Sequence, residues 1–120
     1  MTMFHIHPHA ACDRYPALLA SFVEEYGADT APAFAAQFAA AEATDLHWES
    51  RFGTRSLGRF DGFDDDEDGT ELMRIIGFFR GRYFVANCLV DSEMRVHALL
   101  KLTRFDDVAA AESAFRHGGG

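Results

Sequence analysis

The sequence has few of the features that would place a protein outside the cell or in a membrane. Only two of its 120 residues are cysteines, Cys12 and Cys88, which is too few for a secreted disulfide framework. In a reducing compartment each is expected to be a small buried side chain. No run approaches the roughly 18 consecutive apolar residues of a membrane span. Residues 1–10 carry histidines where a signal peptide needs an apolar stretch. These absences predict a cytoplasmic protein without a membrane partner.

The sequence also lacks the short motifs of common enzyme chemistries. It has no G-x-S-x-G, no phosphate-binding glycine loop, no C-x-x-C and no H-E-x-x-H. Cys88 shares one face of a predicted strand with Phe84, Ala86 and Val90, which is typical of a buried, inert thiol. The sequence therefore favours a protein that is not an enzyme, with no resident cofactor.

What is present is ordinary globular composition, with 48% hydrophobic and 25% charged residues. A chain of this length is close to the commonest size of one domain. We therefore expect a single α+β domain over residues 1–120, with residues 1–12 and 118–120 as flexible ends.

Hydrophobic periodicity predicts the order of the elements. Apolar residues recur at helical spacing after Asp13 and again after Thr30, and Asp106 is the expected N-cap of a last helix. Between them the period changes to two. The predicted fold has two N-terminal helices, an antiparallel meander of four to five strands, and one C-terminal helix, with the helices packed on one sheet face. The predicted helices cover 13–26, 30–43 and 106–117, and the predicted strands cover 46–52, 56–63 (weak), 72–79, 82–90 and 96–103.

The formal net charge of −8 is concentrated in one segment. Residues 61–71 contain seven acidic residues and no basic residue, whereas the rest of the chain is nearly balanced. A mimic of nucleic acid would need acids over a broad face, so a nucleic-acid partner is not expected. The strand-rich part from 72 to 105 is net positive, and the helical segments are negative. These charges could neutralise each other within the fold or support a homodimer.

The acidic segment contains Asp64-Asp65-Asp66-Glu67-Asp68-Gly69, which satisfies the front half of a calcium loop. The twelfth position of an EF-hand loop would be Ile75 instead of glutamate, so any Ca²⁺ site would be weak, with Asp64, Asp66, Asp68 and Glu71 as ligands. A solvated acidic loop explains the same residues. A third interpretation is a docking loop for a basic protein partner. The docking residues would be Asp64, Asp65, Asp66, Glu67 and Asp68.

Two histidine-containing groups could bind ligands. His5, His7 and His9 alternate and would share one side of an extended segment, where they could approach a transition metal or simply face solvent. In the predicted strand 46–52, His47, Glu49 and Arg51 share one face. With Asp61 they could line a ligand-binding or catalytic pocket between the helices and a curved sheet, although a solvated strand face explains them equally.

Twelve phenylalanines are many for 120 residues, and three modest helices do not obviously bury all of them. Phe78 and Phe79 are adjacent and must point to opposite faces of a strand. An apolar sheet surface left uncovered would need another chain. The sequence therefore favours a small acidic interaction domain, such as an inhibitor, an immunity protein or a chaperone-like adaptor. It would bind a protein partner through this sheet surface and the acidic loop 61–71.

Overall fold

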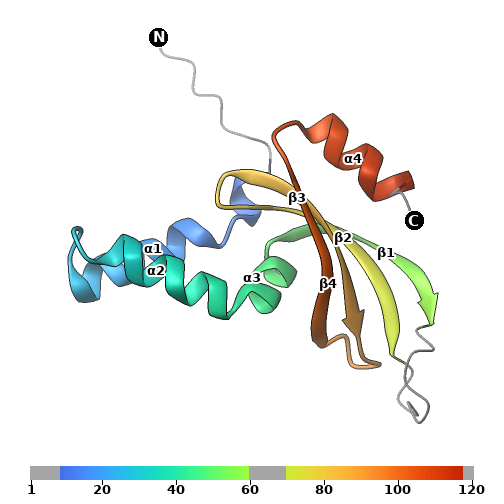
Figure 1. The fold of residues 1–120 in the computed structure, drawn as a ribbon, viewed down its shortest axis with the longest axis horizontal. Coiled ribbons are helices and arrows are strands. Elements are labelled where there is room, and N and C mark those ends of the chain that lie inside the picture. Colours follow the sequence, from blue (N-terminus) through green and yellow to red (C-terminus); the bar gives the residue numbers. More distant parts are fainter. Residues whose placement is uncertain (1–8, 60–69, 118–120) are drawn as a thin grey trace.

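The computed structural model describes residues 9–59 and 70–117, and it confirms the α+β class (Figure 1). Three α-helices precede a four-stranded antiparallel sheet, and a fourth helix follows it. Among the described residues, no helix is long and apolar enough to cross a membrane. The elements are a 3-10 turn η1 (Ala10–Cys12), α1 (Tyr15–Tyr26), α2 (Ala31–Ala41), α3 (Ala43–Glu49), β1 (Arg51–Arg59), β2 (Glu71–Phe79), β3 (Arg82–Val90), β4 (Val96–Phe105) and α4 (Val108–His117).

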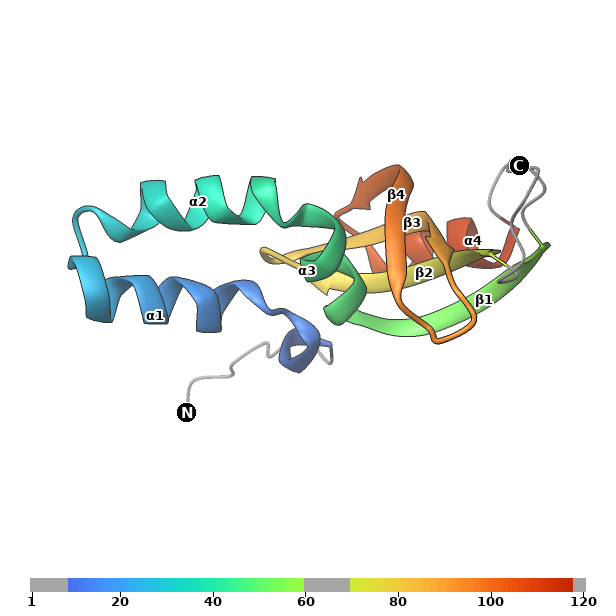
Figure 2. The same ribbon diagram turned by 90° about the horizontal axis from the view of Figure 1, so that it is seen from below.

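The sheet is a simple meander in the order β1-β2-β3-β4, and its strands curve strongly (Figure 2). The two central strands pair in unbroken register from Glu71 opposite Val90 to Phe79 opposite Arg82. The pairings of β1 with β2 and of β3 with β4 each contain two irregularities. Because bulges interrupt regular pairing, they discourage a further strand from adding at either edge.

The sheet is covered on both faces, so the expectation that the helices pack on one face is wrong. Leu46 and Trp48 of α3 pack with Phe79 and Phe84 on one side. Ala111 and Phe115 of α4 belong to a second apolar cluster, with Ile76, Phe78, Tyr83 and Val85, on the other side. Phe78 and Phe79 are therefore both buried. The sheet is the middle layer of the structure between two small cores.

The predicted strand over 46–52 is wrong for residues 46–49, which form α3. Leu46 N–H donates to Glu42 O at 2.9 Å, and Ser50 N–H donates to Leu46 O at 3.0 Å. A run as short as Leu46 to Glu49 fits either period, and its leucine and glutamate favour helix. The N-terminal helices are therefore three instead of two, and the first strand begins at Arg51.

A close backbone contact joins α3 to the sheet. Ser50 is fully buried, and its carbonyl accepts a hydrogen bond from Phe78 N–H at 3.2 Å. A Cβ atom at Gly77 would lie 2.5 Å from Ser50 O and 2.5 Å from Phe84 Cζ. Only glycine therefore lets the end of α3 approach β2 so closely.

Two cross-strand arginines hold the end of α4. Arg55 and Arg74 are register partners on β1 and β2, and both donate to the carbonyl of Phe115, at 3.2 and 3.3 Å. Guanidinium groups are favourable there because the last helical carbonyls lack intrahelical donors. At the other end of α4 the cap is Asp107, whose carboxylate accepts from Ala110 N–H, and not Asp106, which pairs with Arg82.

Asp13 joins α1 to the turn between β2 and β3. Its Oδ1 accepts from Tyr15 N–H at the helix start and from Arg80 N–H, and its Oδ2 accepts from Gly81 N–H, each at 2.9 Å. We expect Asp13→Ala to lower the free energy of unfolding by about 1–2 kcal/mol because three donors lose their acceptor. Urea denaturation measures this loss. Asp13→Asn keeps one acceptor oxygen, so its stability should lie between those of the parent and Asp13→Ala. Equal stability of the parent and both variants would contradict the role of Asp13 in joining α1 to the turn.

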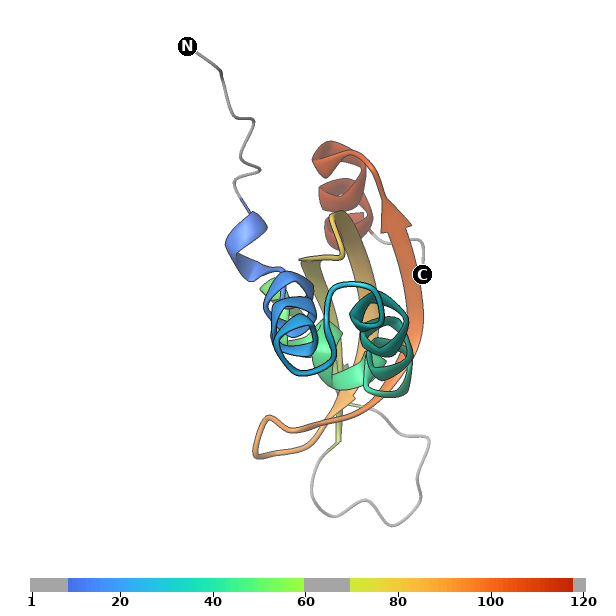
Figure 3. The same cartoon turned by 90° about the vertical axis from the view of Figure 1, so that its left-hand side faces the viewer.

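The α1–α2 hairpin projects beyond the sheet. The helices lie side by side and antiparallel, and only their ends near α3 approach the sheet (Figures 2 and 3). α1 contains no buried residue, and the buried residues of α2 are alanines: Ala31, Ala35 and Ala39. The radius of gyration is 16.2 Å, whereas a compact domain of this length has about 13–14 Å. The projecting hairpin therefore exposes side chains that a compact fold would bury.

Candidate functional site

The best candidate for a functional site is a shallow apolar groove on the outer part of the hairpin. It has a volume of about 410 Å³. Each helix contributes two aromatic side chains that are four residues apart. They therefore lie one turn apart on the same face of their helix. The lining residues are Phe22, Tyr26, Phe34, Gln37 and Phe38.

The aromatic rings of this groove pack on one another but not on the sheet. Tyr26 and Phe34 meet edge to face with ring centroids 4.9 Å apart, and Phe22 meets Phe38 at 5.8 Å. Tyr26, Phe34 and Phe38 remain 40–46% exposed. Of the six large apolar residues that are exposed in the described chain, these three and Val23 lie on the hairpin. A clustered apolar surface of this kind is typical of an interaction site.

The hairpin that carries the groove is acidic. Residues 15–42 contain Glu24, Glu25, Asp29 and Glu42 but no lysine, arginine or histidine. The Gln37 amide and the Tyr26 hydroxyl are the polar side-chain groups among the residues that line the groove. The site therefore offers apolar contact area inside an electrostatic field of one sign, and it offers no nucleophile, no general base and no metal-ligand cluster.

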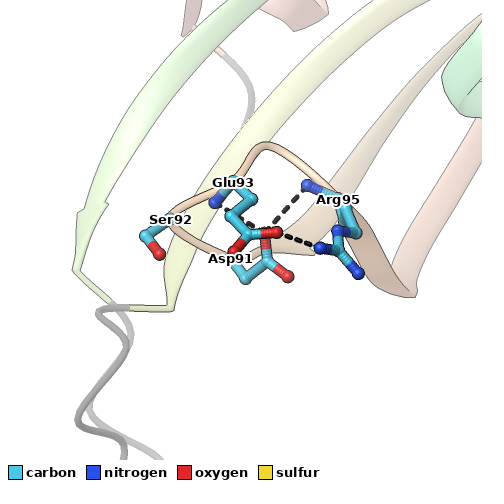
Figure 4. A pocket seen from close by; sticks show the side chains of 4 residues that line it. All are labelled: Asp91, Ser92, Glu93 and Arg95. Atoms are coloured by element: carbon cyan, nitrogen blue, oxygen red, sulfur yellow. Dashed lines mark hydrogen bonds and ion pairs between the residues drawn. The ribbon is translucent and has the colours of Figure 1, made fainter.

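A second pocket lies at the turn between β3 and β4, and its polar groups stabilise that turn (Figure 4). Asp91 Oδ1 accepts from Glu93 N–H at 2.8 Å and from Arg95 N–H at 2.9 Å, and Oδ2 accepts from His97 Nε2. The Arg95 N–H, followed by His97, holds the pKa of Asp91 below its usual range. Arg95 also pairs with Glu93. Since these groups satisfy one another, the pocket has little left for a ligand.

The structure does not bring His47, Glu49 and Arg51 together. His47 is buried against Phe79 and Phe84, with ring centroids 4.8 and 4.7 Å away. Glu49 is exposed at the end of α3. Their expected common strand face does not exist because both lie on a helix, two residues apart. Asp61, the fourth residue of the predicted pocket, lies outside the described residues.

Arg51 is held by its neighbour instead of facing a pocket with His47. Its guanidinium lies 3.8 Å from the centroid of the Trp48 ring, and Nη1 donates to Trp48 O at 2.5 Å. Burial lowers the pKa of Arg51, which still remains a cation at neutral pH. A separate groove at Arg51–Thr54 contains neither His47 nor Glu49. The side chain therefore has a packing role beside Trp48.

His47 is nonetheless an unusual residue. Its Nδ1 donates to Ala43 O at 2.6 Å, whereas Nε2 is buried and has no hydrogen-bond partner. Burial lowers the pKa of His47, and the hydrogen bond to Ala43 opposes this only in part. His47 is therefore a neutral core residue, and protonating it costs stability.

Of the predicted metal ligands, only His9 and Glu71 can be located. His9 stacks on Phe52 of β1 with ring centroids 3.7 Å apart, and its Nδ1 lies 3.2 Å from the Tyr83 hydroxyl of β3, so this residue packs on the sheet. Glu71 accepts from the Ser56 hydroxyl. Residues 9–59 and 70–117 contain no group of three histidines, cysteines or carboxylates that could hold a metal. The other predicted ligands lie outside the described residues: His5, His7, Asp64, Asp66 and Asp68.

The predicted docking residues of the acidic loop lie outside the described residues: Asp64, Asp65, Asp66, Glu67 and Asp68. Residues 60–63 of the predicted strand 56–63 lie outside them too, and residues 56–59 belong to β1 instead of a separate strand. Cys88 is fully buried, and burial raises its pKa to about 11. The prediction of an unreactive thiol is thus supported. Cys12 is half-buried.

The spacing of Phe34 and Phe38 on an alanine-rich stretch is the sign of this groove in the sequence. In the structure the buried residues of α2 are alanines, whereas Phe34 and Phe38 contact Tyr26 and Phe22 of α1 and remain 40% and 42% exposed. Comparison with family models, curated proteins and solved structures finds no match.

Proposed function

We propose that this chain is a non-enzymatic protein-interaction domain, an adaptor or inhibitor, that binds its partner through the aromatic groove of the α1–α2 hairpin. One observation carries the proposal. Tyr26, Phe34 and Phe38 form a cluster that projects from the body of the fold and stays 40–46% exposed. Exposed aromatic clusters of this kind supply the main binding energy of many interfaces because they are rigid and bury a large apolar area.

The hairpin replaces the apolar sheet surface expected from the sequence as the main contact, because the sheet is covered on both faces, whereas the acidic loop remains part of the proposal. Leu100 on β4 is 51% exposed and is the most exposed large apolar residue of the described sheet. The central strands are buried on both faces, so the hairpin offers the larger apolar surface. We assign the main contact to the hairpin and an auxiliary, electrostatic contact to residues 61–71.

The first test combines capture from the source cell lysate with a hairpin variant. We expect Phe34→Ser/Phe38→Ser to lose a captured partner, with at least about 100-fold weaker binding of the purified pair, because two central aromatic contacts are removed. Mass spectrometry and titration calorimetry measure this loss. Leu100→Ser is the matched control, since it removes an exposed apolar residue elsewhere and should keep the partner.

Circular dichroism shows whether binding is lost because the contact is removed or because the hairpin unfolds. If only the contact is removed, the helical signal of the double serine variant should equal that of the parent. Phe34→Leu/Phe38→Leu keeps apolar side chains and should restore much of the binding. A partner that the double serine variant retains at full affinity would overturn the hairpin as the binding surface.

A second variant tests the acidic loop. Asp64→Asn, Asp65→Asn, Asp66→Asn and Asp68→Asn together should weaken a basic partner at low salt, while the melting temperature stays nearly unchanged. The same affinity for parent and variant at low salt would remove the loop from the interface. Weak Ca²⁺ binding by this loop stays a prediction.

We also propose a cytoplasmic homodimer. Residues 72–105 are net positive and residues 61–71 strongly negative, so one chain carries two segments of opposite sign. Analytical ultracentrifugation at low and high salt tests the dimer, which should dissociate as salt screens the contact.

A further inference from the structure

We infer that the partner segment seated in the hairpin groove is an amphipathic α-helix with lysines or arginines beside its apolar face, and that it completes a three-helix bundle with α1 and α2. This inference rests on the proposed function and names the chemistry of the partner. Its evidence is the shape of the groove and the charge of the hairpin.

The groove has the form of a missing helix. Two antiparallel helices supply its walls, and each contributes two aromatic side chains one turn apart, Phe22 with Tyr26 and Phe34 with Phe38. These rings contact one another across the hairpin, so side chains spaced by three or four residues on a third helix would pack on top of the two pairs. The volume of about 410 Å³ suits a few large apolar side chains, not a whole domain.

The negative charge of the hairpin favours basic residues beside the apolar face of the partner helix. Glu25, next to Tyr26 on α1, and Asp29, in the turn after α1, are both exposed, and residues 15–42 contain no basic side chain that could neutralise them. Glu24 lies on the opposite face of α1 and adds only to the net charge of the hairpin. A helix flanked by lysine or arginine would gain attraction and faster association, whereas one flanked by glutamate would be repelled. The same repulsion acts between two hairpins, which disfavours a second copy as the occupant.

Gln37 offers a direct test of this charge preference. It lines the groove, it is exposed, and no hydrogen bond of its side chain is recorded in the structure. Glutamate and lysine both favour helix, so Gln37→Glu and Gln37→Lys should leave the hairpin folded. The pair changes the charge at the groove by two units with little change in size.

The probe is a displayed library of 20-residue helical peptides. Leucine, phenylalanine, methionine or alanine occupies the apolar face, and every flanking position is drawn equally from lysine, glutamate, glutamine and serine. The library is selected on the full chain, and clones that also bind Phe34→Ser/Phe38→Ser are removed. We expect an excess of lysine over glutamate at the flanks. The selected peptides should bind Gln37→Lys about tenfold more weakly than Gln37→Glu.

Each other result contradicts the inference in a distinguishable way. Selected peptides that need Phe34 and Phe38 for binding but show no excess of lysine at their flanks would overturn the inference of a basic partner. They would leave the hairpin as an interaction site. A lack of binding peptides, together with a dimer that the double serine variant cannot form, would make a second copy the occupant. A lack of binding peptides from a chain that is monomeric, or whose dimer the double serine variant still forms, would overturn both this inference and the proposed use of the hairpin.

Discussion

Gly77→Ala should lower the free energy of unfolding by about 3 kcal/mol, the largest loss that we expect from a single methyl group in this protein. The new Cβ would lie 2.5 Å from the Ser50 carbonyl oxygen and 2.5 Å from Phe84 Cζ. A backbone carbonyl cannot move away by rotating a side chain. The end of α3 would therefore separate from β2, with loss of the hydrogen bond from Phe78 N–H. The melting temperature should fall by more than about 10 °C in a calorimetric scan.

Gly53→Ala is the matched control because it adds the same methyl group to the neighbouring strand. There the new Cβ would meet one close atom, Ile76 Cγ2 at 2.9 Å, which belongs to a side chain. We expect a loss of about 1 kcal/mol. If both variants lost the same stability in urea denaturation, the close approach of α3 to β2 would not be what holds the helical part to the sheet.

Acid should destabilise the protein below pH 6.5 through His47. Burial lowers the pKa of His47 in the folded state, whereas the unfolded chain takes up a proton near pH 6.5. The unfolded state then binds more protons, so the contribution of neutral His47 is complete above pH 6.5 and is lost as the pH falls toward the folded-state pKa. The slope is about 1.4 kcal/mol per pH unit, which gives a loss of at most about 2 kcal/mol between pH 6.5 and 5.

Urea denaturation at several pH values between 5 and 8 measures this dependence. His47→Gln cannot take up the proton, so its stability should depend less on pH in this interval, even if the variant is less stable at pH 7. His97→Gln is the control, because His97 is an exposed histidine paired with Asp91 and its removal should keep the acid-dependent loss. Equal slopes for His47→Gln and the parent would show that His47 is not the residue responsible.

If the acid effect is as expected, it bears on the proposed interaction as well. α3 joins the hairpin to the sheet, and His47 is its buried anchor against Phe79 and Phe84. A binding assay for the hairpin should therefore be run near pH 7.5, where His47 is neutral and α3 remains packed.

Much of the fold could be predicted from the sequence because the signals were local. The strands 71–79 and 82–90 lie within one residue of the predicted strands, since a strongly apolar run, a turn with glycine and a second apolar run define a hairpin. The last helix was predicted equally well, although its cap is one residue later. The helix at 43–49 was missed because four residues of apolar and polar alternation are compatible with either period.

The sequence by itself determined the α+β class, the order of the strands, the buried state of Cys88 and the uneven distribution of charge, because each depends on local pattern or composition. Only the tertiary structure decided which apolar residues remain exposed. An aromatic stripe has the same periodicity whether it faces a core or solvent, and its burial depends on where neighbouring elements lie. For Phe34 and Phe38, the decisive fact is that the hairpin extends beyond the sheet, so no part of the described chain is there to cover them.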